Sequence, residues 1–247
     1  MATLRSWTLS ASHVDVTNSQ TMRAVSLGAL PQSLTIDLER TAAIVVDMQN
    51  DFCAPGGWLD TIGVDVAPAA AAVDPLVRLL PRLRGADVPV VWLNWGNRPD
   101  LANLPPNVRH VYDADGTGGG IGDRAGASEA VLVEGSWGAA IVDGLAVAPA
   151  DIHVSKYRMS GFFDTPLDSI LRSLRVDTIL FAGVNADQCV LATLTDAACL
   201  GYDVVLVEEA CATTSPSFCL DATVYNVRQC FGFTTTPAQL EAALPSS

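Results

Sequence analysis

Three reactive side chains stand where short apolar runs of the sequence end. Asp47 closes the run AAIVVD, Lys156 closes HVSK, and Cys189 follows TILFAGV by five residues. In an open parallel sheet the carboxyl ends of the strands share one edge, and ligands bind in the crevice there. A carboxylate, an ammonium and a thiol gathered at that edge could activate a sulfur nucleophile. The pattern therefore indicates a cysteine-dependent hydrolase.

Each of the three residues also has an ordinary interpretation. Cys189 falls in the first turn of an expected helix, where free N–H groups and the positive helix end favour an anion. We therefore expect a lowered thiol pKa and a place for an oxyanion. The alternative is a buried structural cysteine, as we expect for Cys199 in mid-helix. Lys156 could be a solvated lysine, and Asp47 a capping or turn aspartate.

The elements that must position these residues follow a regular alternation from residue 42 onward. Short runs rich in Val, Ile and Leu between helical segments predict a mainly parallel six-stranded sheet with both faces covered. Right-handed crossovers then give a three-layer α/β/α sandwich. We expect strands at 42–47, 88–95, 151–156, 178–184, 203–210 and 233–236, and helices at 65–84, 166–174, 186–201, 215–232 and 237–245.

Two segments stand outside this alternation. Residues 1–35 are rich in Ser and Thr, and we interpret them as an N-terminal arm before a single domain at 36–247. The arm is either a partly ordered tail or a segment that clasps another subunit. Residues 96–135 form a long stretch with three prolines and the run GTGGGIG, and loops of this length are usually functional or mobile. Its G-x-G-x-x-A match at 120–125 follows no strand, so we expect a loop rather than a dinucleotide site.

Composition excludes several functional classes. The net charge of −13 and a pI near 4.4 argue against a nucleic-acid partner, which requires a basic surface. No apolar run reaches the ~18–20 residues that span a bilayer, and the first residues lack the apolar core of a signal peptide. We therefore expect a cytoplasmic protein without a membrane partner. The six cysteines form no C-x-x-C pair, so a zinc knuckle or a dithiol is not indicated.

Longer motifs around the three residues resemble those of the isochorismatase-like cysteine hydrolases. The resemblance spans about residues 38–235 and rests on IVVDMQNDF, SKYRMSGFFDTPLD, GVNADQC and GYDVVLVEEACATTSP. It implies an isochorismatase-like fold and assembly as a homodimer or homotetramer, to which the arm could contribute.

The resemblance also implies a mechanism. Asp47, helped by Lys156, takes the thiol proton, and Cys189 attacks an amide carbonyl. Ammonia or an amine leaves, and water hydrolyses the thioester. Members of the family have a cis peptide four residues before the cysteine, which implies one between Val184 and Asn185. That bond would aim the amides of Asn185 and Cys189 at the oxyanion.

The metal-dependent branch of the family does not fit this sequence. Its nicotinamidases carry an aspartate and histidines after the second strand. Here that region reads NWGNRPDLANLPPN, and the histidines stand at 13, 110 and 153. We therefore expect no metal and no other cofactor.

Two groups within the family share further motifs with this chain. The ureidoacrylate group shares PGGWLD, EGSW and SGFFDTPLDSILRS, but has Tyr where this chain has Met159. The biuret and triuret group shares RPDLANLPPNVR, GIGD and a glutamine 40 residues after the nucleophile, here Gln229. The resemblance implies substrate contacts by Phe52, Asn94 and Gln229, with Arg98 and Met159 as further candidates. Phe52 could instead anchor its loop, and Gln229 could be an exposed residue at a helix end.

These similarities favour a small, uncharged ureide such as biuret or triuret as substrate. The alternative is a ureidoacrylate-type or other small amide. A thiol-based redox protein would need a resolving cysteine in reach, and the spacing shows none. A non-catalytic binding protein would have lost a member of the triad, and all three are present.

Overall fold

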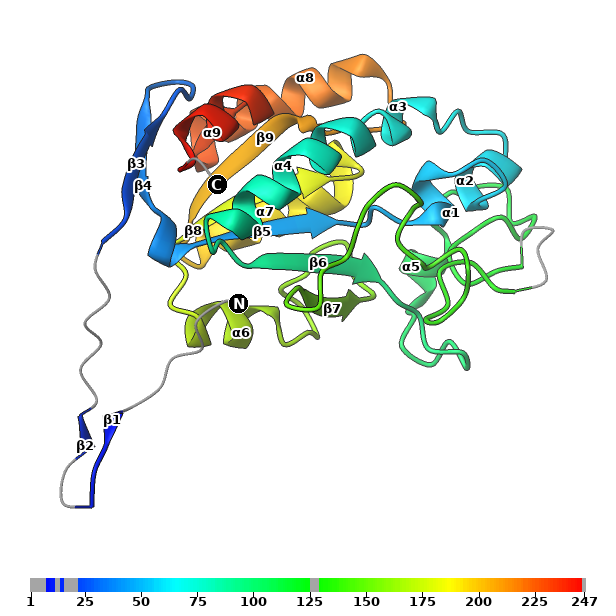
Figure 1. Cartoon of the computed structure of the whole chain (residues 1–247). Helices are drawn as coiled ribbons and strands as arrows, with labels where there is room; N and C mark the ends of the chain where they lie inside the picture. The colour runs from blue at the N-terminus through cyan, green and yellow to red at the C-terminus, as the bar shows by residue number, and fades with distance from the viewer. Residues whose placement is uncertain (1–7, 12–13, 16–21, 125–128, 246–247) are drawn as a thin grey trace.

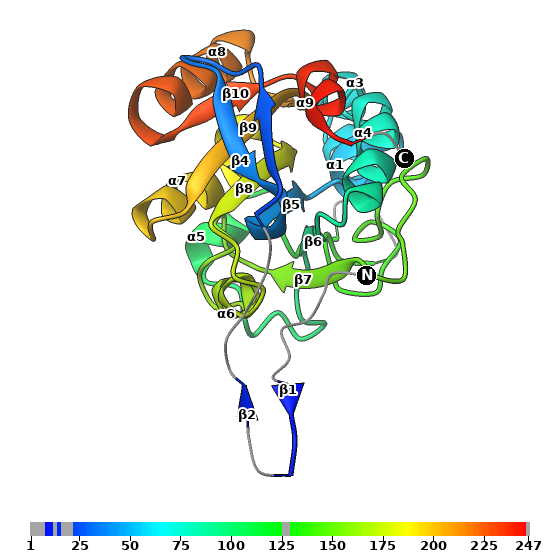
Figure 2. The same cartoon turned by 60° about the vertical axis from the view of Figure 1, so that its left-hand side comes forward.

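A computed structural model describes residues 8–11, 14–15, 22–124 and 129–245 (Figure 1). Strands β1 (Thr8–Leu9) and β2 (Val14–Asp15) pair antiparallel, and this ribbon stands apart from the rest of the molecule in two views (Figures 1 and 2). Residues 1–7, 12–13 and 16–21 of the predicted arm lie outside the described residues. Any role of the arm in clasping another subunit stays a prediction.

Six parallel strands form the central sheet, as the apolar runs predicted. Their order is β10-β9-β8-β5-β6-β7, and all five neighbouring pairs run parallel. Every residue of β5 and β8, at the centre, is buried, because helices cover both faces. The strands are β5 (Thr41–Val46), β6 (Val90–Trp95), β7 (Ile152–Lys156), β8 (Thr178–Gly183), β9 (Asp203–Cys211) and β10 (Phe233–Thr235).

Helices flank the sheet in two layers, which confirms the α/β/α sandwich. The helices α4 (Val73–Gly85) and α9 (Pro237–Ala243) pack together on one face, and α6 (Leu167–Ser173), α7 (Leu191–Cys199) and α8 (Ser217–Asn226) cover the other (Figures 1 and 2). The π-helical turns η2 (Ala186–Val190) and η3 (Val227–Phe231) precede α7 and follow α8.

The helix expected at 65–84 is divided into α3 (Ala67–Ala70) and α4. Pro75 stands in the first turn of α4 and has no N–H to donate to the preceding turn, so α4 begins separately. Leu76, Leu79, Leu80 and Leu83 then recur at helical spacing and are all buried. This stripe seats α4 against the sheet.

A hairpin of β3 (Ala24–Leu27) and β4 (Leu34–Asp37) packs on the domain before η1 (Leu38–Arg40). Leu27 and Ile36 are buried in the core, and Leu30 bridges Thr234 of β10. The predicted boundary after residue 35 therefore falls inside β4. The described residues 22–35 belong to the packing of the domain, because the apolar positions of the hairpin need the core to cover them.

The long stretch 96–135 lies over the carboxyl edge of the sheet, beside α1 (Asn50–Cys53) and α2 (Trp58–Thr61) (Figure 1). It contains one helical turn, α5 (Pro106–Arg109), and residues 125–128 lie outside the described part. The buried carboxylate of Asp51 accepts the N–H groups of Trp58 (3.0 Å) and Leu132 (2.8 Å). That carboxylate ties the stretch to the elements that follow β5.

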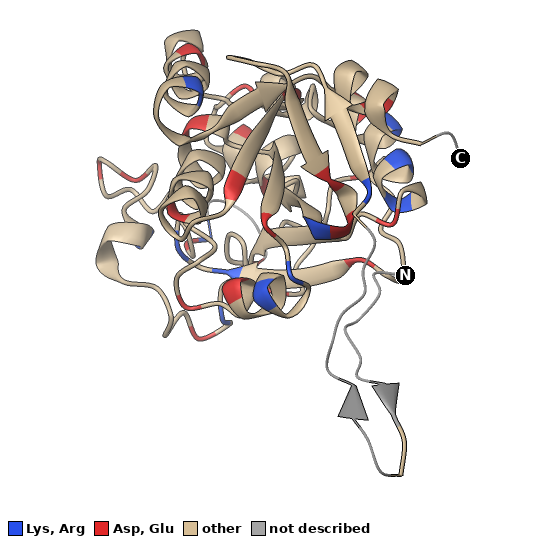
Figure 3. Cartoon of the chain, turned by 90° about the vertical axis from the view of Figure 1, so that its left-hand side faces the viewer, with Lys and Arg blue, Asp and Glu red and all other residues tan. Residues whose placement is uncertain are grey.

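Charged residues are scattered over the helices, strand ends and loops in Figure 3, with acidic and basic positions interspersed. Within the described ranges, no helix combines the length and apolar composition needed to cross a bilayer.

Candidate active site

Asp47, Lys156 and Cys189 meet at the carboxyl edge of the sheet. Asp47 follows β5, Lys156 ends β7 and Cys189 lies in η2 after β8, and the strand order β8-β5-β6-β7 places these ends on four consecutive strands. Lys156 Nζ lies 2.7 Å from Asp47 Oδ2, and both side chains are 0% exposed. The Cys189 thiol lies close enough to both groups to influence the pKa of each. The structure thus brings together the three residues that the strand ends suggested.

Asp47 is placed by an unusual backbone conformation. Its φ of 48° lies in the left-handed region, which aspartate tolerates better than most residues. Its N–H still donates to the carbonyl of Leu93 on β6 (2.9 Å), so the turn is fixed to the sheet. Held in this turn, the carboxylate faces the end of β7 instead of continuing the strand.

Lys156 is held as a buried ammonium. Its Nζ lies 4.1 Å from the centroid of the Trp95 ring and donates to the carbonyl of Arg158 (3.3 Å). Burial alone lowers the pKa of Lys156, but the interactions of the ammonium with Asp47 and with Cys189 together outweigh burial, and its pKa is raised. The positive charge is therefore a permanent part of the site.

The pKa of Cys189 differs from the expectation. Burial is the main cause that raises it, Lys156 opposes burial only in part, and Asp47 adds to the increase, so that the pKa is raised to about 12. The predicted lowering by the helix end is wrong because the thiol is only 4% exposed and faces a carboxylate. Burial also raises the pKa of Asp47, although Lys156 opposes this. The resting site therefore holds a protonated thiol beside a buried carboxylate of increased basicity.

The backbone around η2 provides a free N–H donor. The peptide bond between Val184 and Asn185 is cis, as the resemblance implied. Ala186 donates its N–H to the carbonyl of Ala212 (2.8 Å), and Val190 donates to that of Asn185 (3.2 Å). The N–H of Asn185 has no acceptor among the described residues, and its side-chain Oδ1 accepts the N–H of Thr214 (3.1 Å). An anion beside the thiol could use the N–H of Asn185.

Phe52 and Asn94 occupy different surroundings. Phe52 is buried in α1 and packs edge-on against Trp58, at 5.9 Å between ring centroids. Asn94 pairs with Ser155 across β6 and β7, on the face opposite to Lys156. It lines a separate cavity of about 180 Å³, and its Oδ1 has no partner among the described residues. The strand alternation therefore turns Asn94 away from the thiol.

Gln229 lies away from the three residues, and Arg98 is a surface residue. Gln229 is exposed in η3, just before the amino end of β10, and Gly232 beside it approaches Val204 at the amino end of β9. Helix α8 returns from the carboxyl edge toward the opposite edge, where β10 begins, so η3 at its end lies away from Cys189 of the same chain. Arg98 is exposed and paired with Asp100.

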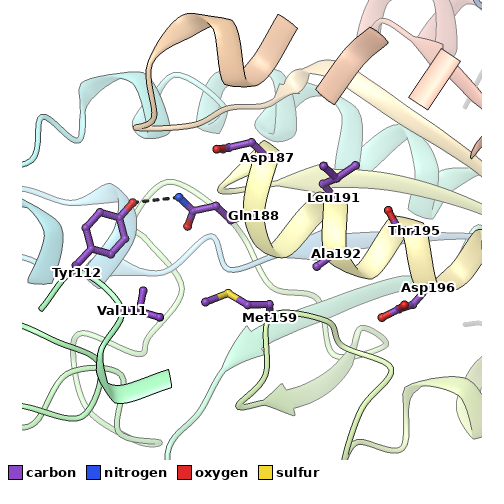
Figure 4. A pocket seen from close by; sticks show the side chains of 9 residues that line it. All are labelled: Val111, Tyr112, Met159, Asp187, Gln188, Leu191, Ala192, Thr195 and Asp196. Atoms are coloured by element: carbon purple, nitrogen blue, oxygen red, sulfur yellow. Dashed lines mark hydrogen bonds between the residues drawn. The ribbon is translucent and has the colours of Figure 1, made fainter. Parts of the chain in front are cut away.

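Met159 is the one further candidate that the structure places at the thiol, with its Sδ 3.8 Å from Cys189 Sγ. A pocket of about 690 Å³ begins beside it (Figure 4). Gln188 and Tyr112 also line this pocket and are joined by a hydrogen bond from Gln188 Nε2 to Tyr112 OH (3.1 Å). The position of Gln188 next to the cysteine was a usable signal, whereas nothing in the sequence singled out Tyr112.

Among the residues that the structure describes, no group of three or more His, Cys, Asp or Glu side chains is arranged to hold a metal ion. The absence of a cofactor stays a prediction.

Comparison with known proteins identifies the class to which this fold and site belong. A model of the isochorismatase domain matches residues 41–239, which is most of the chain. The chain therefore belongs to the isochorismatase family. The fold agrees with a cysteine hydrolase from Pseudomonas syringae pv. phaseolicola at a TM-score of 0.71 and 29% identity, covering 84% of this chain and 95% of that one.

Relatives whose names state an activity indicate the type of reaction within this family. Ureidoacrylate amidohydrolase RutB of Azorhizobium caulinodans is 36% identical over 221 residues, which cover 88% of this chain and 96% of the relative. RutB of Cronobacter turicensis is 36% identical over 86% of this chain and 91% of its own length. N-carbamoylsarcosine amidase from Thermoplasma acidophilum has a TM-score of 0.61 and 26% identity, over 80% of this chain and 96% of that one. The prediction of an amidohydrolase is confirmed at this level.

Proposed function

We propose that this enzyme hydrolyses the carbon–nitrogen bond of a carbamoyl group in a small linear ureide, through a thioester on Cys189. The observation that carries the proposal is the fully buried ion pair of Asp47 and Lys156 at the thiol. A buried pair of this kind is costly to maintain and adds little stability by itself. Next to a thiol it supplies a base and a fixed positive charge.

The first half of the reaction begins with proton transfer. Asp47 takes the proton from Cys189 Sγ, and the sulfur forms a bond to the carbonyl carbon. The carbonyl oxygen becomes an oxyanion, and the N–H of Asn185 and that of Cys189 would donate to it. Asp47 then gives its proton to the leaving nitrogen, the carbon–nitrogen bond breaks, and ammonia or an amine departs. A thioester remains on Cys189.

Water completes the cycle. Asp47 takes a proton from a water molecule, whose oxygen attacks the thioester carbon. The carbon–sulfur bond breaks, and the proton returns to Sγ. Throughout, the negative charge moves only between Asp47, Cys189 and the oxyanion, all close to the ammonium of Lys156. A thiol with a pKa of about 12 is compatible with this chemistry, because the proton is transferred within the site and not to solvent.

The names of the relatives support the carbamoyl group as the substrate class. Ureidoacrylate and N-carbamoylsarcosine both carry a terminal carbamoyl group on nitrogen. Within this class we favour an uncharged ureide such as biuret or triuret. Gln229 does not support this choice, since it lies at the other edge of the sheet, so the choice rests on the shared sequence motifs. Identity with the RutB relatives favours a ureidoacrylate-type substrate as the second candidate.

Ammonia release from a panel of amides tests the proposal. The panel contains biuret, triuret, ureidoacrylate, nicotinamide and maleamate. We expect release from at least one ureide, and its loss in Cys189→Ala, Lys156→Ala and Asp47→Asn. Unchanged release in the Lys156 and Asp47 variants would show that the triad is wrong. Mass spectrometry after iodoacetamide treatment should show labelling at Cys189 that Cys189→Ala abolishes.

Assembly and location stay predictions. We expect a homodimer or homotetramer in the cytoplasm, with no nucleic-acid or membrane partner. Sedimentation of the full chain would measure its state of assembly.

A further inference from the structure

The Cys189 thiol is closed off from the pocket beside it. Cys189 is 4% exposed and does not line the pocket of about 690 Å³, whose lining includes Met159 and Gln188 (Figure 4). Met159 Sδ touches the thiol at 3.8 Å. A carbonyl carbon in position for attack must come within ~3–3.5 Å of the sulfur. The side chain of Met159 therefore fills the space beside the sulfur atom that the carbonyl group of a substrate from the pocket must enter.

A second contact closes the same passage. Gln188 Nε2 donates to Tyr112 OH (3.1 Å) and to the hydroxyl of Ser215 (3.3 Å). Tyr112 comes from the long loop and has a φ of 61°, and its ring packs edge-on against Trp58 at 5.5 Å. Gln188, the residue before the nucleophile, is thus held to the long loop by its hydrogen bonds. Of the two side chains between the pocket and the thiol, Met159 is therefore the one that is free to change its rotamer.

We propose that Met159 is the gate and specificity-determining residue between this pocket and Cys189, and that the pocket holds the non-reacting end of the substrate. The inference rests on the proposed function. Methionine is unbranched and has three rotatable side-chain bonds, so it can swing aside without movement of the backbone. Once displaced, its thioether packs on the substrate and limits the width of the group that reaches the thiol.

The lining of the pocket indicates which substrate end it takes. Val111, Leu191 and Ala192 make it largely apolar, while Asp187 and Asp196 stand nine residues apart on η2 and α7, about 13 Å along the helix. None of the lining residues is basic. Asp187 accepts a hydrogen bond from the hydroxyl of Thr213, and the lining contains no positively charged side chain that could pair with either carboxylate. A substrate with a carboxylate is disfavoured here, and an uncharged or cationic end is favoured.

Alkylation of Cys189 in the full-length protein tests the gate without any turnover. The rates for iodoacetamide and for the bulkier N-benzyl iodoacetamide are followed by mass spectrometry of the peptide that contains Cys189. Met159→Ala should raise the rate for the bulky reagent, relative to iodoacetamide, at least tenfold. Met22→Ala, which removes a methionine that is 71% exposed, serves as the matched control and should leave the ratio unchanged. A ratio within twofold of wild type in Met159→Ala would overturn the gate.

A further variant guards against misfolding. If Met159→Ala loses its cooperative urea transition, Met159→Val carries the test, with an expected increase of at least threefold. Met159→Leu keeps the volume of the side chain and should keep the ratio low. A different result would contradict the proposed function, namely release of ammonia by Cys189→Ala. In that case the alkylation ratios still decide the gate.

The charge selection has its own test. The rate of iodoacetate relative to iodoacetamide is compared with the same ratio for the protein unfolded in urea. The folded protein should show a lower ratio, and Asp196→Asn should raise it about threefold at low salt, with a smaller effect at high salt. Asp221→Asn on the exposed side of α8 is the matched control. If Asp196→Asn leaves the ratio unchanged, the pocket does not select by charge.

Discussion

Replacing Lys156 by Met should destabilise the protein in a manner that depends on pH. The substitution keeps most of the aliphatic stem against Trp95 but removes the ammonium 2.7 Å from Asp47 Oδ2. At that distance the direct attraction is about 6 kcal/mol for an effective dielectric constant of ~20. Part of this only offsets the burial of the lysine, so we expect a loss of about 3–5 kcal/mol at pH 7.5.

The pH dependence follows from the carboxylate that is left behind. Without Lys156, burial raises the pKa of Asp47 further above its unfolded value of about 3.9. A raised acid pKa leaves stability intact below the unfolded value and removes about 1.4 kcal/mol per pH unit above it, until the folded pKa is passed. The variant should therefore lose less stability at pH 5 than at pH 7.5.

Urea unfolding of wild type and Lys156→Met at the two pH values measures the effect. The double variant Lys156→Met with Asp47→Asn removes both charges and is the control. It should recover most of the stability that the single variant loses, because no uncompensated charge stays buried. Equal losses at both pH values, or a double variant no more stable than the single one, would refute the reasoning.

Three other outcomes follow from the same geometry. Because burial raises the pKa of Asp47, kcat/KM should rise with pH through an acid limb above the ordinary aspartate value of 3.8. Because the pKa of Cys189 is about 12 and that of Lys156 is raised, kcat/KM should then stay constant through pH 9. A fall of kcat/KM before pH 9 in a pH–rate profile would contradict this. Gln229→Ala should keep steady-state kcat/KM within twofold, whereas a tenfold loss would mean that a glutamine from another subunit reaches the site. Asn185→Ala removes the hydrogen bond from Thr214 N–H to Oδ1, which holds the backbone N–H of residue 185 in place as the proposed oxyanion donor. We expect kcat to fall about five- to tenfold, which corresponds to ~1–1.4 kcal/mol, with KM little changed; an effect confined to KM would count against that role.

The grouping of the three candidate catalytic residues could be predicted from the sequence because parallel strands impose a common direction. Asp47, Lys156 and Cys189 each follow a strand, and any right-handed parallel arrangement brings such ends to one edge. The pairing of distant segments was not needed for that inference. It was enough to know that the strands were parallel and where they ended.

Features of the site that sequence reasoning did not anticipate depend on one residue of register or on three-dimensional packing. Asn94 lies one residue before Trp95, and a shift of one residue turns a strand side chain to the other face. Gln229 was chosen by its spacing from Cys189, but spacing does not show at which end of a crossover helix a residue falls. Met159 and Tyr112 reach the site from loops, and the hydrophobic periodicity of a sequence does not predict the path of a loop.

The raised pKa of Cys189 and the closed position of Met159 have one physical origin. The packing that leaves the thiol 4% exposed also removes the water that would stabilise a thiolate. With a pKa of about 12, a thiol acting alone would be ionised at pH 7 to roughly one part in 10⁵. Its reactivity must therefore come from Asp47 and from a substrate whose carbonyl can accept the charge. A thiol of this kind stays protonated while the pocket is empty, and the chemistry begins only when a substrate has displaced Met159.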